Sequence, residues 1–210
     1  MKAVILATLL LCCATVSWAA EDPSALVRNT AEQVRTVLLK ENGSNTDAVR
    51  SEVEQLVLPR FDFTRMTALA VGKNWRQATD QQKSALTTEF RILLTRTYFS
   101  TMLRYRDAKI SIKPDTLLEN EGKEATVKSQ VQVASNNAPV AIDYVLYNTA
   151  EGWKFFNVIV EGASLVTVYR NQFGDEVSKG GIDGLIQSLH TKNLAPAPQS
   201  ANAAAAPVKS

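Results

Sequence analysis

The residues most able to carry catalysis in this chain are a carboxylic acid and a phenol side by side, Asp143 and Tyr144, in an otherwise apolar segment. A carboxylate in an apolar pocket can act as a general base, with a tyrosine as the proton donor. The segment has the composition of a strand, however, and neighbouring side chains of a strand point to opposite faces. The simpler interpretation is therefore that Asp143 meets solvent or an arginine.

The other residues that could act as nucleophiles or metal ligands do not form a motif. The only histidine, His190, lies in an amphipathic segment near the C-terminus, where a solvent-facing or helix-end position is expected. Ser164 follows a strand pattern in Gly162-Ala163-Ser164, but without a partner histidine it is not a nucleophile. Cys12 and Cys13 both lie in a leader segment, so the mature chain has no thiol and no metal or other cofactor is predicted.

Basic side chains gather along one segment of the chain, and their role has two interpretations. They could form a solvated helix face, or a few of them could lie at the mouth of a pocket and bind a phosphate. Spacing alone leaves both open. The formal net charge is only +2, so nothing in the composition favours nucleic acid as a partner. The residues concerned are Arg91, Arg96, Arg104, Arg106 and Lys109.

Both ends of the chain have compositions that differ from the middle. Residues 1–19 combine Lys2, an apolar run and Ser17-Trp18-Ala19, which predicts a secretory signal peptide cleaved after Ala19. The apolar run is too short to span a bilayer comfortably. The last residues are mostly Ala, Pro, Ser, Asn and Gln, a composition typical of disorder. We expect one domain over 20–190 and a disordered tail over 191–210.

The first half of the mature chain has the 3.6-residue period of amphipathic helices. The longest predicted helix covers residues 80–106, about 40 Å, and begins with a capping box of Thr79 and Gln82. It is apolar around most of its circumference, so it is buried between layers or lines a cavity. A second long pattern begins with Ser164 as its cap and breaks at Gly180-Gly181.

The second half changes to the two-residue period of strands. Four runs separated by turn residues predict an antiparallel meander over 108–112, 125–133, 140–147 and 153–160. In the last run, alternation puts Phe155 on one face and Phe156 with Val158 on the other, so both faces must be covered. The predicted fold is α+β, with helices on one side of a four-stranded antiparallel sheet.

The predicted long helix and two of the predicted strands carry more apolar residues than one packed face requires, and this has two interpretations. Packed without gaps, the long helix and the two doubly apolar strands make a generous core. Held open by curvature of the sheet, they line a cavity for a lipid or another hydrophobic ligand.

Several segments occur in an order and spacing that are specific together, although none is decisive alone. They are Leu58-Pro59 with Phe61, Val71-Gly72-x-x-Trp75-Arg76-Gln77-Ala78-Thr79, Gln82, Glu89-Phe90, Val160-Glu161-Gly162-Ala163-Ser164-Leu165, Tyr169-Arg170-x-Gln172-Phe173 and Lys179-Gly180-Gly181-Ile182-Asp183-Gly184-Leu185. With these segments the chain resembles the MlaC family, the periplasmic phospholipid-binding proteins of the Mla (maintenance of lipid asymmetry) pathway, also called the toluene-tolerance family. The resemblance covers nearly all of the mature chain.

The resemblance implies a curved sheet like that of nuclear transport factors, with helices closing its concave face around a hydrophobic cavity. It implies that the acyl tails of a phospholipid lie inside and the headgroup faces water, with the lipid as cargo and no catalysis. It also implies a ferry in the periplasm, expected to be a monomer, that exchanges lipid with an outer-membrane lipoprotein–porin complex and an inner-membrane ABC transporter complex. Outer-membrane lipid asymmetry would depend on this exchange.

Candidate lipid-binding residues follow partly from the resemblance and partly from the apolar patterns. The Glu161-Gly162-Ala163 junction matches the family motif without gaps beside the family's cavity, which makes Ala163 a candidate wall residue. Which strand face looks inward stays open at this point. The candidates from the apolar patterns are Phe90, Leu94, Tyr98, Met102, Ile142, Tyr144, Leu146, Phe156, Val158, Val166 and Tyr169.

Two other functions stay open beside a lipid carrier. The same cone-shaped fold hosts isomerases and dehydratases, so a secreted enzyme is the alternative. Only Asp143 with Tyr144 or Tyr147 could supply its polar groups. A solid adaptor with no cavity is the third possibility.

Overall fold

The computed structural model describes residues 22–132 and 138–195 of the chain. The predicted signal peptide and most of the predicted tail lie outside the described residues. The last described helix continues to Leu194, so the predicted domain end at residue 190 falls inside a helix. The helical part extends this far because Leu189 and Asn193 are both buried.

Among the described residues, every α-helix except α2 (Thr46–Val57) begins at a side-chain cap. The Asp22 carboxylate accepts from the Ala25 N–H, and Thr79 and Gln82 form the predicted capping box. Gly181, with φ of 67°, interrupts the last helix as expected, because only glycine adopts this backbone region without strain. The helices are α1 (Pro23–Leu38), α2 (Thr46–Val57), α3 (Phe63–Val71), α4 (Asp80–Arg104) and α5 (Leu165–Leu194), with 3₁₀ turns η1 (Leu58–Arg60), η2 (Gly72–Gln77) and η3 (Asn120–Gly122).

Within the described residues, the sheet is antiparallel and has six strands where four were predicted. The two additional strands are too short to show a two-residue period: β2 pairs with β3, and β6 pairs with the end of β5. The order is β1-β3-β4-β5-β6. The strands are β1 (Lys109–Ile112), β2 (Leu117–Glu119), β3 (Glu124–Gln132), β4 (Val140–Thr149), β5 (Gly152–Val160) and β6 (Ala163–Ser164).

A β-bulge in β5 corrects the predicted faces of that strand. The register shifts between Val145 and Leu146, which pair with Asn157 and Phe155, so Phe156 is the extra residue. Phe155 therefore shares a face with Val158, whereas Phe156 points the other way. Simple alternation assigned these three side chains wrongly.

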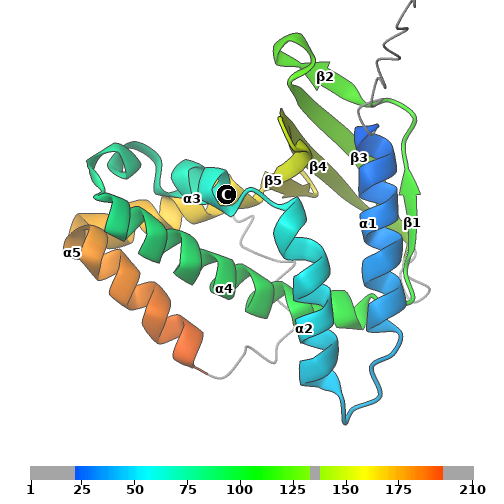
Figure 1. The fold of residues 1–210 in the computed structure, drawn as a ribbon, viewed down its shortest axis with the longest axis horizontal. Helices are drawn as coiled ribbons and strands as arrows, with labels where there is room; N and C mark the ends of the chain where they lie inside the picture. The colour runs from blue at the N-terminus through cyan, green and yellow to red at the C-terminus, as the bar shows by residue number, and fades with distance from the viewer. Residues whose placement is uncertain (1–21, 133–137, 196–210) are drawn as a thin grey trace, which may run out of the picture.

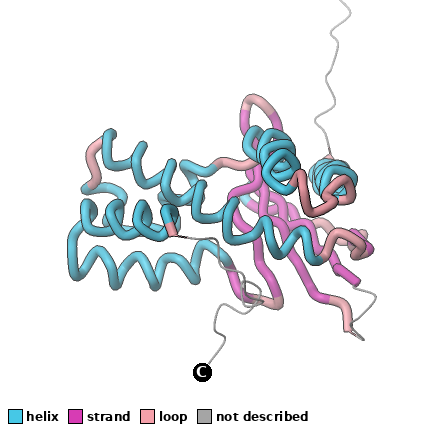
Figure 2. The backbone as a smooth tube through the Cα atoms, turned by 90° about the horizontal axis from the view of Figure 1, so that it is seen from below, coloured by secondary structure: helices cyan, strands magenta, loops and turns pink. Residues whose placement is uncertain are grey.

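Each face of the sheet packs against a different group of helices, so the prediction of helices on one side only was wrong. On the face that we call the α1 face, Leu26 and Val27 of α1 pack with Leu146, Trp153 and Phe155. On the opposite face, the bundle face, Phe156 joins the core of α3, α4 and α5. Figure 1 shows α1 lying along the sheet and α3, α4 and α5 grouped to one side of it, and Figure 2 shows the same separation of helices and sheet from below. Both faces of β5 are covered, as its composition requires.

A third apolar cluster joins α1 and α2 to the C-terminal part of α4. Val37 and Leu38 of α1 and Val49 and Val53 of α2 surround Phe99. The long helix α4 thus contacts the bundle core through Phe90 and this cluster through Phe99. It connects the bundle to the helices on the α1 face.

Candidate functional site

The possible acid–base pair does not form. Asp143 pairs across the sheet with Lys128 and Ile159 and lies on the bundle face, while Tyr144 pairs with Val127 and Val158 on the α1 face. Tyr147 shares the face of Asp143 but lies four residues along the strand, about 13 Å away. The polar groups that an isomerase or dehydratase would need are therefore on opposite faces or well apart.

The other candidate catalytic residues have structural partners. Exposed His190 lies 2.9 Å from Glu89, whose carboxylate also accepts from the Asn193 amide at 2.7 Å, which ties α5 to α4. Ser164 caps α5 by accepting from the Thr167 N–H, and its hydroxyl contacts buried Asn157. His190 and Ser164 therefore both have structural roles.

The part of the chain that the structure describes has neither a cluster of metal-ligand side chains nor a helix suited to span a membrane. Within residues 22–132 and 138–195, no three His, Cys, Asp or Glu side chains come together as metal ligands. Among the helices of the same residues, none combines the length and the apolar character needed to cross a membrane.

The candidate lipid-binding residues separate into groups. One group lies in the closely packed core of the bundle, where Phe90 contacts Tyr169 and Phe173 edge to face at 4.8 and 5.1 Å between ring centroids. Tyr98 packs against this core, and Met102 packs against the cluster around Phe99. The buried candidates in the bundle core are Phe90, Leu94, Phe156, Val166 and Tyr169.

The remaining candidates lie together on the α1 face. Ile142 pairs with Val160, which in turn pairs with Ala163, so the three form one row across β4, β5 and β6. Tyr144 and Val158 form the next row. These residues are apolar or aromatic yet only half-buried, unlike Leu146 further along the same face, which is fully buried. We call the two rows the apolar patch: Ile142, Tyr144, Val158, Val160 and Ala163.

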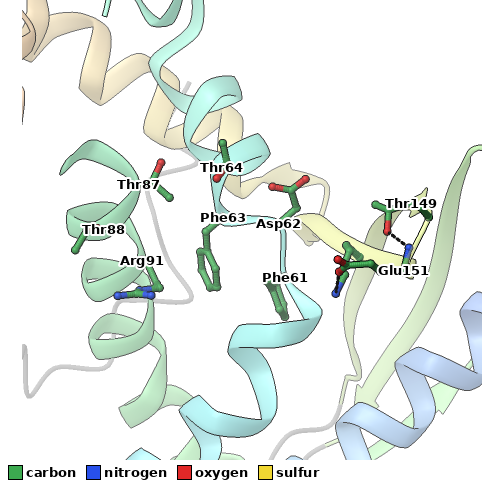
Figure 3. Close-up of a pocket in the computed structure, with 11 residues that line it drawn as sticks. Phe61, Asp62, Phe63, Thr64, Thr87, Thr88, Arg91, Thr149 and Glu151 are labelled. Carbon is green, nitrogen blue, oxygen red and sulfur yellow. Dashed lines mark hydrogen bonds and ion pairs between the residues drawn. The ribbon is translucent and has the colours of Figure 1, made fainter. Parts of the chain in front are cut away.

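Two clefts open between the helices on either side of Arg91. The larger, about 510 Å³, lies between the start of α3, the middle of α4 and the β4–β5 turn, as Figure 3 shows. The smaller, about 330 Å³, lies between α2 and α4. The residues of the larger cleft are Phe61, Asp62, Phe63, Thr64, Thr87, Thr88, Arg91, Thr149, Ala150, Glu151 and Lys154, and those of the smaller are Arg50, Glu54, Leu58, Arg91, Ile92, Thr95 and Arg96.

A series of stacked aromatic rings connects the larger cleft to the apolar patch. Phe63 and Phe61, which both line the cleft, stack with centroids 5.7 Å apart, and Phe61 stacks on Phe155 at 4.8 Å. Phe155 meets the ring of Tyr144, a patch residue, at 5.8 Å. The Asp62 N–H donates to the Phe155 carbonyl, which fixes this segment beside β5. Aromatic side chains in contact with one another therefore lie all the way between the larger cleft and the apolar patch.

Burial on the α1 face raises the pKa of the Tyr144 phenol to about 12, with a hydrogen bond to Ser129 acting in the opposite direction. In the unfolded chain a tyrosine ionises near pH 10. The neutral phenol therefore stabilises the fold fully below about pH 10, and this contribution is lost as the pH rises to about 12. Burial also raises the pKa values of Tyr98 and Tyr169.

From this shift we predict that Tyr144→Phe makes the protein less sensitive to alkali. The urea midpoint at pH 8 and at pH 11 checks it: the fall between the two pH values should be smaller in the variant than in the unmodified protein. Some fall should remain, because Tyr98 and Tyr169 still titrate. An equal fall in both proteins would contradict the burial of the Tyr144 phenol.

Sequence patterns missed several residues of this region. Val160 belongs to the apolar patch and lies on the same face as the candidate Val158, so strand alternation could have found it. Phe61 and Phe63 lie at a helix start and carry no period. Phe61 belongs to one of the segments shared with the MlaC family, but it was not among the lipid-binding candidates; for Phe63 only its aromatic character could have suggested a role. Arg50 lies on a different helix from Arg91 and Arg96, and no spacing rule brings them together.

The basic residues of the predicted cluster have separate positions. Arg91 and Arg96 line the smaller cleft. Arg106 instead pairs with Glu41 at 2.9 Å, and Arg104 and Lys109 are exposed. Of these five residues, only Arg91 and Arg96 line a described cleft, and a phosphate as their ligand stays a prediction.

Comparisons with known proteins agree with this architecture. The model of a protein family described as MlaC protein matches residues 28–191. The chain is 27% identical over 169 residues to toluene tolerance protein ttg2D of Pseudomonas putida, covering 79% of this chain and 77% of that protein. Among solved structures, it is similar to the phospholipid-binding protein from Ralstonia solanacearum in complex with a phospholipid, with a TM-score of 0.74, 34% sequence identity, and coverage of 82% of this chain and 97% of that chain.

Proposed function

The chain belongs to the MlaC protein family, and on this basis we propose that it is a periplasmic carrier that binds phospholipid and has no catalytic activity. The observation that carries the proposal is the likeness to the phospholipid-bound Ralstonia structure, which extends over 97% of that chain. At 34% identity the likeness concerns side chains as well as the fold. The half-buried apolar patch supports the same function, because a soluble protein gains from covering such a surface.

The proposed cavity lies between the α1 face of the sheet and helices α1, α2 and α4. We infer that the sheet curves as in nuclear transport factors, that the helices close its concave face, and that acyl tails lie against the apolar patch. Each buried methylene contributes roughly 0.8 kcal/mol, so two acyl chains supply ample free energy for binding. Of the candidates from the sequence, we keep Ile142, Tyr144, Val158 and Ala163 as wall residues.

We further propose the role of a shuttle for the carrier. It exchanges phospholipid with an outer-membrane lipoprotein–porin complex and an inner-membrane ABC transporter complex, as a monomer, and so maintains the lipid asymmetry of the outer membrane. Family membership supports this role. Apolar tails held without hydrogen bonds suit a shuttle, because the protein must release its cargo as well as bind it.

The test of the function is the chemical content of the purified protein. Protein isolated from the periplasm is extracted with organic solvent, and the extract is analysed by mass spectrometry. We expect phospholipid in a fixed molar ratio to protein, and re-addition of phospholipid to stripped protein should raise its melting temperature. A protein that carries no lipid and gains no stability from added phospholipid would contradict the proposal.

The substitution Ala163→Glu tests whether the edge of the sheet forms part of the cavity wall. The new carboxylate would lie in the row of Ile142 and Val160, where acyl chains would exclude water from it. We expect normal export and a phospholipid content lowered several-fold. Phosphorus analysis of the purified variant measures this, and an unchanged lipid content would remove Ala163 from the wall.

A further inference from the structure

Three arginines line the smaller cleft, between α2 and α4. Arg50 comes from α2, Arg91 and Arg96 come from α4, and the single carboxylate among the lining residues is that of Glu54. Leu58 and Ile92 supply its apolar surface. The cleft thus combines an excess of positive charge with an apolar wall, the pattern expected where a charged headgroup meets an acyl chain.

The three arginines have few acidic partners among the described residues, so most of their positive charge is not compensated. Arg91 makes no hydrogen bond or ion pair with the residues that the structure describes. Arg96 donates to a neutral backbone carbonyl, that of Ala195, at 2.5 Å. Arg50 lies 3.4 Å from Asp47, whose side chain is 94% exposed, and its Nε is buried without a hydrogen-bond partner.

Other arginines of the chain serve as structural ties, which makes the contrast informative. Arg65 pairs with Glu124 at 2.5 Å and lies over the rings of Tyr147 and Phe156. Arg60 donates to Thr30 at 2.8 Å. Within the cleft, Arg50 also has contacts, with the exposed Asp47 at 3.4 Å and with the Phe99 ring at 5.1 Å. Arg96 has only a neutral carbonyl partner, so Arg91 and Arg96 are the two guanidinium groups without an anionic partner among the described residues.

The neighbouring carboxylates do not supply the missing partner. In the larger cleft, which shares Arg91, the Asp62 carboxylate accepts from the Arg65 N–H at the start of α3. Glu151 lies 3.4 Å from Lys154. Only Glu54 faces the three arginines within the smaller cleft, so the lining keeps a net positive charge.

We propose that Arg50, Arg91 and Arg96 bind the phosphodiester of the phospholipid headgroup. Guanidinium groups match phosphate oxygens with paired, charge-assisted hydrogen bonds. The cleft, at about 330 Å³, has room for a phosphate group. This inference rests on the proposed function and adds to it a defined place for the headgroup, whereas the apolar patch holds the tails.

The test compares the release of two lipids that differ in the phosphate. Protein loaded with phospholipid or with diacylglycerol is mixed with acceptor vesicles of phosphatidylcholine, and the rate of lipid transfer is measured. Arg91→Gln should release phospholipid about tenfold faster, because it removes a hydrogen-bonded charge. It should leave the release of diacylglycerol unchanged, since this lipid has no phosphate.

Two further variants keep the result specific. Arg28→Gln removes a charge from an exposed position on α1 and should change neither rate. Arg91→Lys keeps the charge but not the planar fork, so it should fall between the unmodified protein and Arg91→Gln. Arg91 has no partner among the described residues, so Arg91→Gln should keep the melting temperature of the stripped protein.

The outcomes separate this inference from the proposed function and from free phosphate as the ligand. If the unmodified protein binds phospholipid and Arg91→Gln releases it at the same rate, the headgroup site is wrong and the carrier function stands. If neither lipid binds, the carrier function fails and the headgroup site with it. Calorimetric titration of stripped protein with inorganic phosphate completes the test: binding lost in Arg91→Gln, with phospholipid release unchanged, would assign the cleft to free phosphate and overturn the proposal.

Discussion

Val158→Asp is expected to strip the protein of phospholipid while leaving it folded. Val158 is half-buried in the middle of the apolar patch, between Tyr144 and Val160. A carboxylate there would lose its hydration to the acyl chains without gaining a partner, at a cost of several kcal/mol. Since each 1.4 kcal/mol is a factor of ten in affinity, phospholipid content should fall at least about tenfold. Phosphorus analysis of the purified variant measures it.

The matched control places the same side chain on the other face of the sheet. Gln130 lies on β3 within the sheet, but it pairs with Ala141 on the bundle face and keeps part of its surface exposed. Gln130→Asp changes the net charge as Val158→Asp does and should keep the full lipid content. Equal lipid contents in the two variants would show that the α1 face is not the wall of the cavity.

Local patterns predicted the secondary structure well because its determinants are local. The capping box of Thr79 and Gln82, the cap at Ser164 and the break at Gly181 each depend on residues close in sequence. The two-residue period similarly gave the positions of the longer strands. Strands β2 and β6 were missed because two or three residues cannot show a period.

The candidate site was harder to predict because its determinants are not local. Phe90 and Val158 are both apolar residues in apolar stripes, yet one is fully buried in the bundle and the other is half-buried on the sheet. The bulge at Phe156 separates neighbouring aromatic residues onto different faces, and it depends on pairing with β4. Sequence patterns predict that a side chain is apolar but not which surface covers it.

The resemblance added what periodicity could not supply at one position. Ala163 carries little signal of its own, since a small residue after a turn is common. The family motif nevertheless made it a wall candidate, and the register places it in the row of Ile142 and Val160. The larger apolar residues chosen by pattern alone divide between this face, the bundle core and, for Met102, the cluster around Phe99.

Phe90→Ala is expected to destabilise the protein by about 3–5 kcal/mol, the usual range for truncating a buried aromatic residue. Phe90 has no exposed surface and contacts Tyr169 and Phe173 edge to face, so the surrounding bundle cannot easily fill the space. In a domain of this size the melting temperature should fall by roughly 10 °C. The loss should be the same with and without lipid, because the bundle core is packed by protein side chains alone. Phe90→Leu is the milder variant if the alanine variant does not fold.

Thermal melting of loaded and stripped protein distinguishes a core residue from a wall residue. Lipid that binds only the folded state raises the melting temperature by an increment set by its affinity. Phe90→Ala should lower both melting temperatures and keep the increment, whereas Val158→Ala should lower chiefly the increment, because it removes contacts with the acyl chains. If Phe90→Ala reduced the increment and Val158→Ala did not, the tails would lie in the bundle and not on the α1 face. The two variants together thus locate the lipid without a structure of the complex, since each position predicts a different effect on binding and on folding.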